Sequence, residues 1–157
     1  MADTRLHAWP ATDQLEDDHR RIWKLLKWYE DLEFGDTDSK LDLLGQIRRE
    51  LMIHIELEET VFYPSLDALG LEWMQELTTE AHEEHEIVKL LLEQLSRMSP
   101  ADPYFDAKVK VLSDNVRIHA NGEERELFAL FRMLEKADQE HVAEELRRRR
   151  EELAGGH

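Results

Sequence analysis

Long runs of helix-favouring residues, interrupted at only a few points, restrict this chain to an all-α fold. The 157 residues include six glycines and four prolines, which lie mainly between these runs. Within each run the apolar residues recur every three or four positions, which places them on one face of a helix. Strands would need alternation of apolar and polar residues, for which the sequence leaves little room. The chain is therefore expected to form amphipathic helices.

The turn-forming residues set the expected helix boundaries. Four long helices are expected at about residues 14–34, 39–64, 72–98 and 103–134, and a shorter, highly charged helix at about 138–153. Gly35 to Asp38 is expected to form the first turn, and Pro64 to end or kink the second helix. Helices of this length with short connections pack as antiparallel neighbours. The sequence predicts one domain over residues 1–157, with an up-down four-helix bundle at about 12–135 and an additional C-terminal helix.

Composition excludes several classes of function. The chain has no cysteine, so any metal must be held by nitrogen and oxygen. The formal charge of −16 opposes binding to a phosphate backbone, and no nucleic-acid partner is expected. The basic run Arg147 to Arg150 lies between glutamates and is typical of a solvated, salt-bridged helix face. Residues 1–10 lack a secretory signal, and no apolar stretch approaches the ~20 residues of a membrane span. We expect a soluble cytoplasmic protein with no membrane partner.

Four of the eight histidines occupy interior positions of the four long helices: His19, His54, His85 and His119. Adjacent antiparallel helices bring residues that are equally distant from their shared turn to one level. These histidines lie about 15 to 18 residues from the expected turns, so all four can form one layer across the bundle. His7, His141 and His157 lack this relationship and are expected at the surface.

Two of these histidines are followed by a glutamate four residues later, His54 by Glu58 and His119 by Glu123. That spacing stacks both side chains on one helix face. His19 and His85 are 66 residues apart, and the two His-x-x-x-Glu pairs are 65 residues apart. The chain therefore resembles two related helical hairpins, which together would form a pseudo-twofold site with facing carboxylates.

Two carboxylates flanked by imidazoles suit a pair of divalent or trivalent metal ions. Carboxylates can bridge two ions, and imidazole favours iron, zinc, copper and nickel. The alternative is a set of polar residues on solvated helix faces, because one His-x-x-x-Glu pair arises easily by chance in a chain this rich in glutamate. Six residues matched in level favour the metal site.

The chain resembles the hemerythrin-like, HHE cation-binding family over about residues 12–135. The likeness is carried by Asp18-His19, by the segment from His54 to Pro64, by Glu84-His85 and by the segment from His119 to Phe128. The resemblance implies a non-haem centre of two iron ions joined by a bridging oxo or hydroxo group. It also implies that His54 and His119 are terminal ligands on different irons, with Glu58 and Glu123 as bridges.

One position departs from the family pattern. Hemerythrin has two histidines four residues apart on its third helix, whereas here Ala81 stands four residues before His85 and His82 stands three before it. His82 shares that helix face and could be a fifth imidazole ligand, although the adjacent glutamates are also typical of an exposed surface. Five histidines would leave one open coordination position and suit reversible dioxygen binding. Four would leave exchangeable positions on both irons and suit peroxide or nitric oxide chemistry.

The expected function is the binding or sensing of dioxygen or nitric oxide at this centre. An enzyme that acts on hydrogen peroxide or nitric oxide is the alternative, and an iron-responsive or purely structural metal-binding bundle is a third class. Trp23, Phe62 and Phe128 lie close to the ligand positions in sequence. They are expected to keep water out of a gas-sized pocket or simply to pack in the core, while Tyr63 is expected to point elsewhere.

Overall fold

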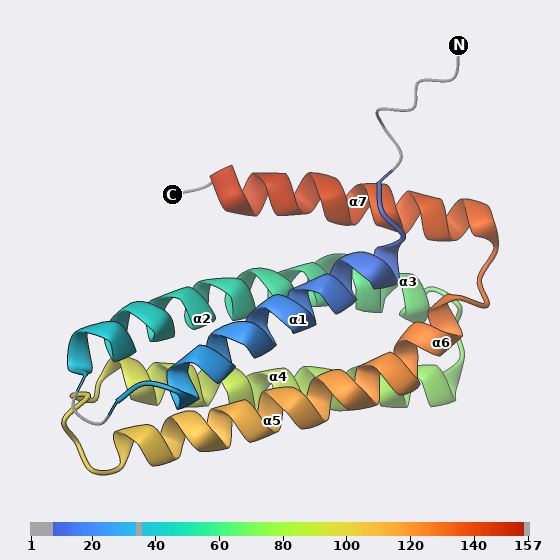
Figure 1. Cartoon of the computed structure of the whole chain (residues 1–157). Helices are drawn as coiled ribbons and strands as arrows, with labels where there is room; N and C mark the ends of the chain where they lie inside the picture. The colour runs from blue at the N-terminus through green and yellow to red at the C-terminus, as the bar shows by residue number, and fades with distance from the viewer. Residues whose placement is uncertain (1–7, 34–35, 156–157) are drawn as a thin grey trace.

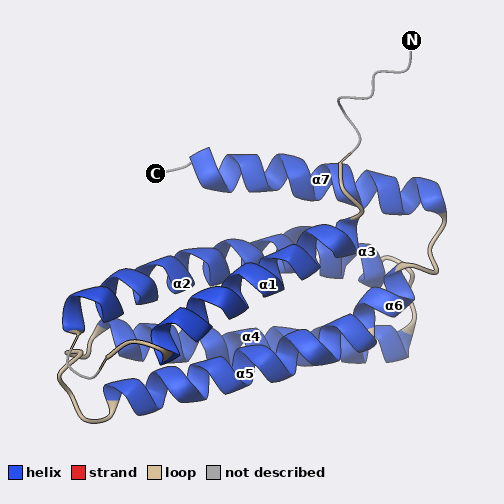
Figure 2. Ribbon diagram, viewed as in Figure 1, coloured by secondary structure: helices blue, strands red, loops and turns tan. Residues whose placement is uncertain are grey.

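The computed structural model describes residues 8–33 and 36–155, and every regular element within these ranges is helical. The long helices are α1 (Ala11–Glu30), α2 (Thr37–Leu57), α4 (Glu72–Ser96), α5 (Phe105–Arg125) and α7 (Lys136–Gly155). The short elements are the π-helical turn η1 (Glu58–Phe62), α3 (Tyr63–Asp67) and α6 (Leu127–Phe131). The predicted all-α bundle with an additional C-terminal helix is confirmed (Figure 2). No helix in the described ranges is both long and apolar enough to cross a membrane.

Two helical hairpins form the bundle. α1 packs against α2, α4 packs against α5, and α1 also contacts α5, so the hairpins face each other. In Figure 1 the α1–α2 pair lies above the α4–α5 pair, and α7 runs across the top in contact with α1 and α2. The expected end of the first helix at Phe34, the turn residue Gly35 and the surface positions of His7 and His157 lie outside the described residues.

Buried apolar side chains form two clusters along the bundle. One cluster fills the end near the α1–α2 connection and includes Ile22, Leu26, Ile47, Leu92 and Phe105. The other joins α3, α6 and α7 to the opposite end and includes Leu15, Phe62, Phe128 and Leu146. The four histidines of the long helices are in neither cluster. The histidine layer therefore has apolar packing at both ends of the bundle, which limits its contact with water.

The expected end or kink of the second helix at Pro64 is instead a π-turn that begins at Glu58, after α2 ends at Leu57. The backbone N–H of Tyr63 donates to the carbonyl of Glu58, the i to i+5 bond of the wider turn. One extra residue in the turn brings Tyr63 close to the angular position that residue i+4 would hold in an α-helix. Pro64 follows in the first turn of α3, where its missing N–H costs that helix no hydrogen bond.

The C-terminal helix is tied to the bundle by two arginines of its basic run. Arg150 donates to Asp18 Oδ2 at 2.8 Å, and Arg149 donates to Glu56 Oε1 at 3.1 Å. The prediction of a solvated face holds for the two preceding arginines, which pair with glutamates of their own helix. Arg149 also pairs with Glu152 of its own helix and is 36% exposed, but the prediction is wrong for Arg150, which lies one turn beyond the fully buried Leu146 and faces the bundle.

Candidate metal centre

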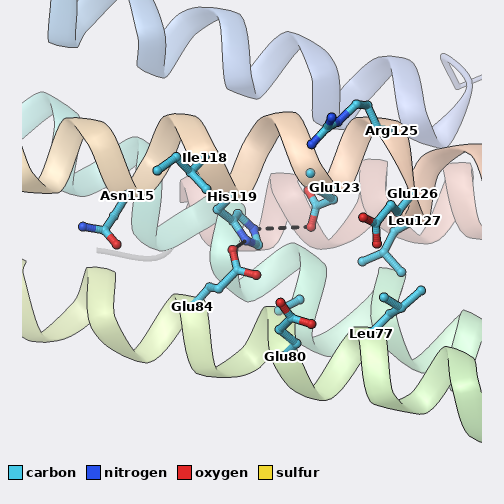
Figure 3. A pocket seen from close by; sticks show the side chains of 12 residues that line it. Leu77, Glu80, Glu84, Asn115, Ile118, His119, Glu123, Arg125, Glu126 and Leu127 are labelled. Atoms are coloured by element: carbon cyan, nitrogen blue, oxygen red, sulfur yellow. Dashed lines mark hydrogen bonds and ion pairs between the residues drawn. The ribbon is translucent and has the colours of Figure 1, made fainter.

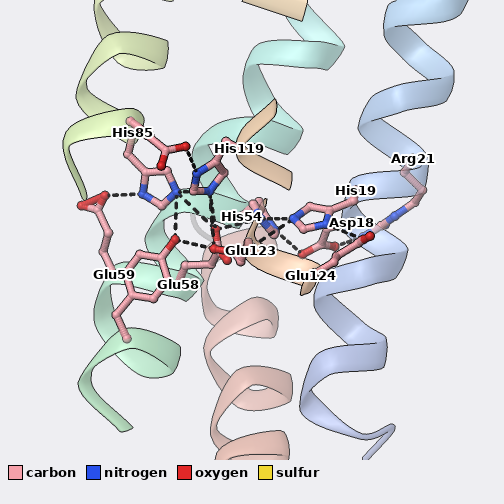
Figure 4. Close-up of polar contacts among 12 residues, drawn as sticks. Asp18, His19, Arg21, His54, Glu58, Glu59, His85, His119, Glu123 and Glu124 are labelled. Atoms are coloured by element: carbon pink, nitrogen blue, oxygen red, sulfur yellow. Dashed lines mark hydrogen bonds and ion pairs between the residues drawn. The ribbon is translucent and has the colours of Figure 1, made fainter. Parts of the chain in front are cut away.

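Four histidine side chains meet inside the bundle, one from each of its long helices. They are His19 on α1, His54 on α2, His85 on α4 and His119 on α5 (Figure 4). The Nε2 atoms of His19 and His54 are 3.1 Å apart, and those of His85 and His119 are also 3.1 Å apart. None of these side chains is more than 9% exposed. The layer inferred from the distances to the turns is therefore present in the structure.

Glu58 and Glu123 lie between the two histidine pairs. Oε1 of Glu58 is 2.9 Å from Nε2 of His54 and 3.2 Å from Nε2 of His85. Oε1 of Glu123 is 3.3 Å from Nε2 of His19, and its other oxygen is 3.4 Å from the imidazole on α5. Each carboxylate therefore reaches one imidazole of each hairpin, as a bridging ligand would.

Each of the four imidazoles also contacts a carboxylate on the outer side of the layer. The partners, at 2.9 Å in every case, are Glu124 for His19, Asp18 for His54, Glu59 for His85 and Glu84 for His119. An ionised carboxylate only accepts hydrogen bonds, so the ring proton is placed on Nδ1 and the lone pair of Nε2 points inward. The outer carboxylates thus orient all four rings toward a shared centre.

The charges of the layer strongly shift its pKa values. Burial alone would lower the pKa of His54, but the charge of Glu58 and the hydrogen bond to Asp18 outweigh burial and raise this pKa to about 10. Burial also opposes a charge on His119, yet Glu123 raises its pKa well above the usual value. For Glu58, burial favours the neutral form, but the charge of His54 brings its pKa well below the usual range. The buried carboxylates require positive charge, which either imidazole protons or a metal cation can supply.

Tyr63 points into this layer, and the expectation that it faces elsewhere is wrong. Its side chain is fully buried, and its hydroxyl donates to Glu123 Oε2 at 2.5 Å and lies 3.3 Å from His85 Nε2. The π-turn is the physical reason, because it turns Tyr63 to the same side as Glu58. Burial and the charges of the two central glutamates raise the pKa of Tyr63 well above its ordinary value, so the phenol stays protonated.

His82 does not join the other predicted ligands. Its side chain is 42% exposed, and its Nδ1 is 3.7 Å from Glu59. A residue three positions before His85 is rotated by about 60° around the helix axis. The ring consequently lies on the outer side of Tyr63, with the ring centroids 5.3 Å apart. The position four residues before His85, where the family pattern has a histidine, is buried at 4% exposure, but here it is Ala81.

The aromatic residues expected near the site fall into two groups. Phe62 and Phe128 are fully buried, and Phe128 stacks on His19 with the ring centroids 5.7 Å apart. Trp23 is instead 38% exposed and stacks against the guanidinium of Arg117 at 4.1 Å, so it lies at the rim. The predicted surface position of His141 is confirmed by a side chain that is 75% exposed.

The donor set fits a pair of metal cations. Two nitrogens bound at right angles to one cation, each about 2.1 Å from it, are about 3.0 Å apart, which matches both histidine pairs. The candidate ligand atoms form two groups, each within 4.8 Å, and the groups share Glu58 and Glu123. Both oxygens of Glu58 and Oε1 of Glu123 are buried, and apart from the imidazole nitrogens of the layer they have no hydrogen-bond partner among the described residues. Such oxygens are costly unless a cation compensates them.

The outer carboxylates extend the internal duplication, and the sequence analysis missed this. Asp18 and Glu84 each precede a histidine of the layer, and each binds the histidine of the adjoining helix. Glu59 and Glu124 each follow a central glutamate and bind the remaining two imidazoles. The signal was available, because each pair is separated by the same 65 or 66 residues as the ligands it serves.

Comparisons with known proteins agree with this geometry. Residues 11–131 match the family model described as the hemerythrin HHE cation binding domain. A protein of Nostoc sp. (strain PCC 7120) named DNA nickase is 33% identical over 121 residues, which cover 76% of this chain and 33% of that protein, so the chain spans about a third of its length. The fold is similar to the crystal structure of a hemerythrin HHE cation binding domain-containing protein from Mycobacterium kansasii. The TM-score is 0.78 at 24% identity, covering 94% of this chain and 88% of that one.

Proposed function

Because this chain belongs to the hemerythrin HHE cation-binding domain family, we propose that its buried layer holds two iron ions joined by a bridging oxo or hydroxo group. The ligands in this proposal are His19, His54, Glu58, His85, His119 and Glu123. His82 is left out because its side chain is half exposed and lies away from the converging atoms. The centre acts on a small molecule, and hydrogen peroxide is the substrate that the geometry favours.

The observation that carries this proposal is the convergence of four imidazoles, not five, on two shared carboxylates. Each hairpin supplies two imidazoles, and both carboxylates reach both hairpins. Neither cation would then be fully surrounded by protein ligands, so both would keep exchangeable positions. That arrangement favours turnover of a small substrate over carriage at a single open position.

The chain's own residues supply proton transfer and orientation. Tyr63 holds a proton at the edge of the layer, hydrogen-bonded to Glu123, and can donate it to a peroxide oxygen. The outer carboxylates hold the imidazoles in one tautomer, and the apolar clusters at both ends restrict water. When bound, two adjacent irons supply one-electron redox chemistry at neighbouring positions. The proposed reaction is balanced without another reductant, since one peroxide is oxidised to dioxygen while a second is reduced to water.

Dioxygen or nitric oxide binding, as in a sensor, is the second candidate, and one observation favours it. A small cavity of about 20 Å³ lies against all four imidazoles, and its other walls are apolar side chains that include Ile22, Leu51 and Val88. An apolar cavity of this size admits about one small molecule. It is suited to an uncharged diatomic ligand, which gains little from the polar side of the layer.

DNA nicking is not carried over from the relative of that name. The matching region is a third of that protein, and the charge of −16 on this chain opposes contact with phosphates. A purely structural or iron-responsive role for the metal can be distinguished from peroxide turnover by experiment. In those cases the loaded protein would change its stability or shape and leave peroxide unchanged.

The proposal is tested with protein that is stripped by a chelator and reloaded anaerobically with ferrous iron. We expect about two irons per chain, followed by evolution of dioxygen when hydrogen peroxide is added, in a ratio of one dioxygen to two peroxides. Zinc-loaded protein is the control, because zinc fits similar ligands but has no redox chemistry. A reversible spectral change with dioxygen and no peroxide turnover would favour the sensor. Nicking of supercoiled plasmid by the loaded protein, absent with zinc, would favour the activity named for the relative.

A further inference from the structure

A pocket of about 310 Å³ connects the surface to the buried layer on the side formed by α4 and α5 (Figure 3). Two of the proposed ligands, His119 and Glu123, form part of its wall. The rest of the wall includes Glu80 and Glu84 from α4 and Glu126, which follows α5. The pocket therefore leads from solvent to the metal layer past several carboxylates.

A second surface pocket, of about 280 Å³, approaches the layer between α1 and α5 and has the opposite charge. Its wall carries Arg20 and Arg117 against the single carboxylate of Glu124. The α4–α5 pocket has four carboxylates against one guanidinium, that of Arg125. A cation is therefore attracted to the α4–α5 pocket and repelled from the other.

Glu123 provides an observation that is independent of the acidic rim. It is 4% exposed and lines the α4–α5 pocket, and apart from the imidazole nitrogen of His19 at 3.3 Å its Oε1 has no hydrogen-bond partner among the described residues. A cation arriving through the pocket would meet Glu123 and His119, the two proposed ligands in its wall. We infer that the α4–α5 pocket is the uptake route for the metal, and that Glu80 and Glu126 collect divalent cations and pass them to Glu123. The inference rests on the proposed metal centre and concerns how that centre is filled.

The wall also offers a way to close the pocket without disturbing the ligands. Gly122 lines the pocket, and a Cβ added there meets nothing within 4 Å. Its backbone is helical, so a larger residue suits the helix better than glycine does. Gly122→Leu should therefore narrow the pocket and leave the fold intact.

The test measures the rate of Co²⁺ uptake by chelator-treated full-length protein, followed by stopped-flow visible absorption, with final metal content determined separately. Glu80→Gln combined with Glu126→Gln should slow uptake by about three- to tenfold and leave the final content unchanged, because two steering charges are lost. Arg125→Gln should speed uptake. Salt should slow the wild type more than the double variant. The controls are Glu83→Gln, exposed on α4 outside the pocket wall, and Arg20→Gln in the α1–α5 pocket.

Gly122→Leu should slow uptake in the same way without changing any charge. The inference is overturned if the double variant and Gly122→Leu both load at the wild-type rate. It is equally overturned if Glu83→Gln slows uptake as much as the double variant does, since net charge and not the pocket would then control the rate. Failure of the wild type to bind any Co²⁺ or iron would instead remove the metal centre itself, together with its uptake route.

Discussion

The two halves of the metal layer come from duplicated hairpins but have different surroundings. On the α1–α2 side the outer carboxylate Asp18 is 1% exposed and is held by Arg21 and by Arg150 of α7. Its counterpart on the α4–α5 side, Glu84, is 36% exposed and lines the acidic pocket. A ring stacks on one imidazole of each half, and it is Phe128 in the first and Tyr63 in the second.

This difference separates two tasks within one symmetric donor set. In the α1–α2 half, Arg150 of α7 covers the Asp18 carboxylate beside His54, and the ring that stacks on His19 is apolar and carries no hydroxyl proton. The α4–α5 half has an open pocket and a phenol, and we propose that metal exchange and proton transfer take place there. The repeated spacing accounts for the symmetric donor set, and the proposed function depends on the differences between the two hairpins.

The largest effect is expected from removal of the carboxylate that both halves share. Glu58→Ala takes away a carboxylate that contacts an imidazole of each hairpin, and its loss should abolish tight binding of both metals. Metal analysis after dialysis measures the result. Glu83→Ala is the control, because that side chain is exposed on α4. Equal metal content in the two variants would contradict the bridging role of Glu58.

Tyr63→Phe makes the two halves more alike, because Phe128 already stacks in the first half. Loss of the phenolic proton should lower peroxide turnover by about 100-fold while the metal content stays near two per chain. Steady-state evolution of dioxygen measures the effect. Tyr29→Phe is the matched control, since the hydroxyl of Tyr29 donates to Asp106 outside the layer. Unchanged turnover in Tyr63→Phe would show that Tyr63 only packs against the imidazole.

In metal-free protein, acid should lower the free energy of unfolding by protonating the buried carboxylate of Asp18. Burial alone would raise the pKa of Asp18, but the hydrogen bond and charge of His54, together with Arg150, lower it from 3.8 to about 2. A carboxyl whose pKa is lower in the folded state stabilises the fold above its unfolded pKa. About 2 kcal/mol should therefore be lost as the pH falls from 4 to 2. Denaturant unfolding across this range should show this loss in wild type and in Asp17→Asn, and a total loss smaller by about 2 kcal/mol in Asp18→Asn, where other buried carboxylates such as Glu58 still take up protons.

The smallest effect tests the ion pair by which Arg150 of α7 holds Asp18. Arg150→Met leaves Asp18 with His54 and Arg21 as partners, so the free energy of unfolding should fall by about 1–2 kcal/mol. Chemical denaturation measures it, with Arg148→Met as the control because Arg148 pairs only with glutamates of its own exposed face. A loss that is the same in both variants would mean that α7 does not brace the site.

The sequence predicted the parts of this site that depend on helical periodicity. Apolar spacing located the long helices, and the distances of His19, His54, His85 and His119 from the turns predicted the layer that the structure contains. Helical periodicity is local and regular, so counting along the chain was sufficient. The i, i+4 spacing also brought Glu58 and Glu123 to their places beside the imidazoles.

Helical periodicity does not predict the places where the helix departs from regular geometry or where distant segments meet. A single π-turn places Tyr63 in the site, and regular periodicity could not predict that one extra residue. The contact of Arg150 with Asp18 joins residues at opposite ends of the chain. The composition of a charged helix does not predict which distant residue its arginines will contact. His82 failed to join the cluster because one residue of offset rotates a side chain out of the layer.

The central claim is that four imidazoles and two carboxylates hold two irons without His82. The most direct measurement is the iron content of wild type and His82→Ala after anaerobic loading and dialysis. We predict about two irons per chain in both proteins, because the side chain of His82 is 42% exposed and its nitrogen faces Glu59. One iron or none in the wild type, or loss of iron from His82→Ala alone, would contradict the account.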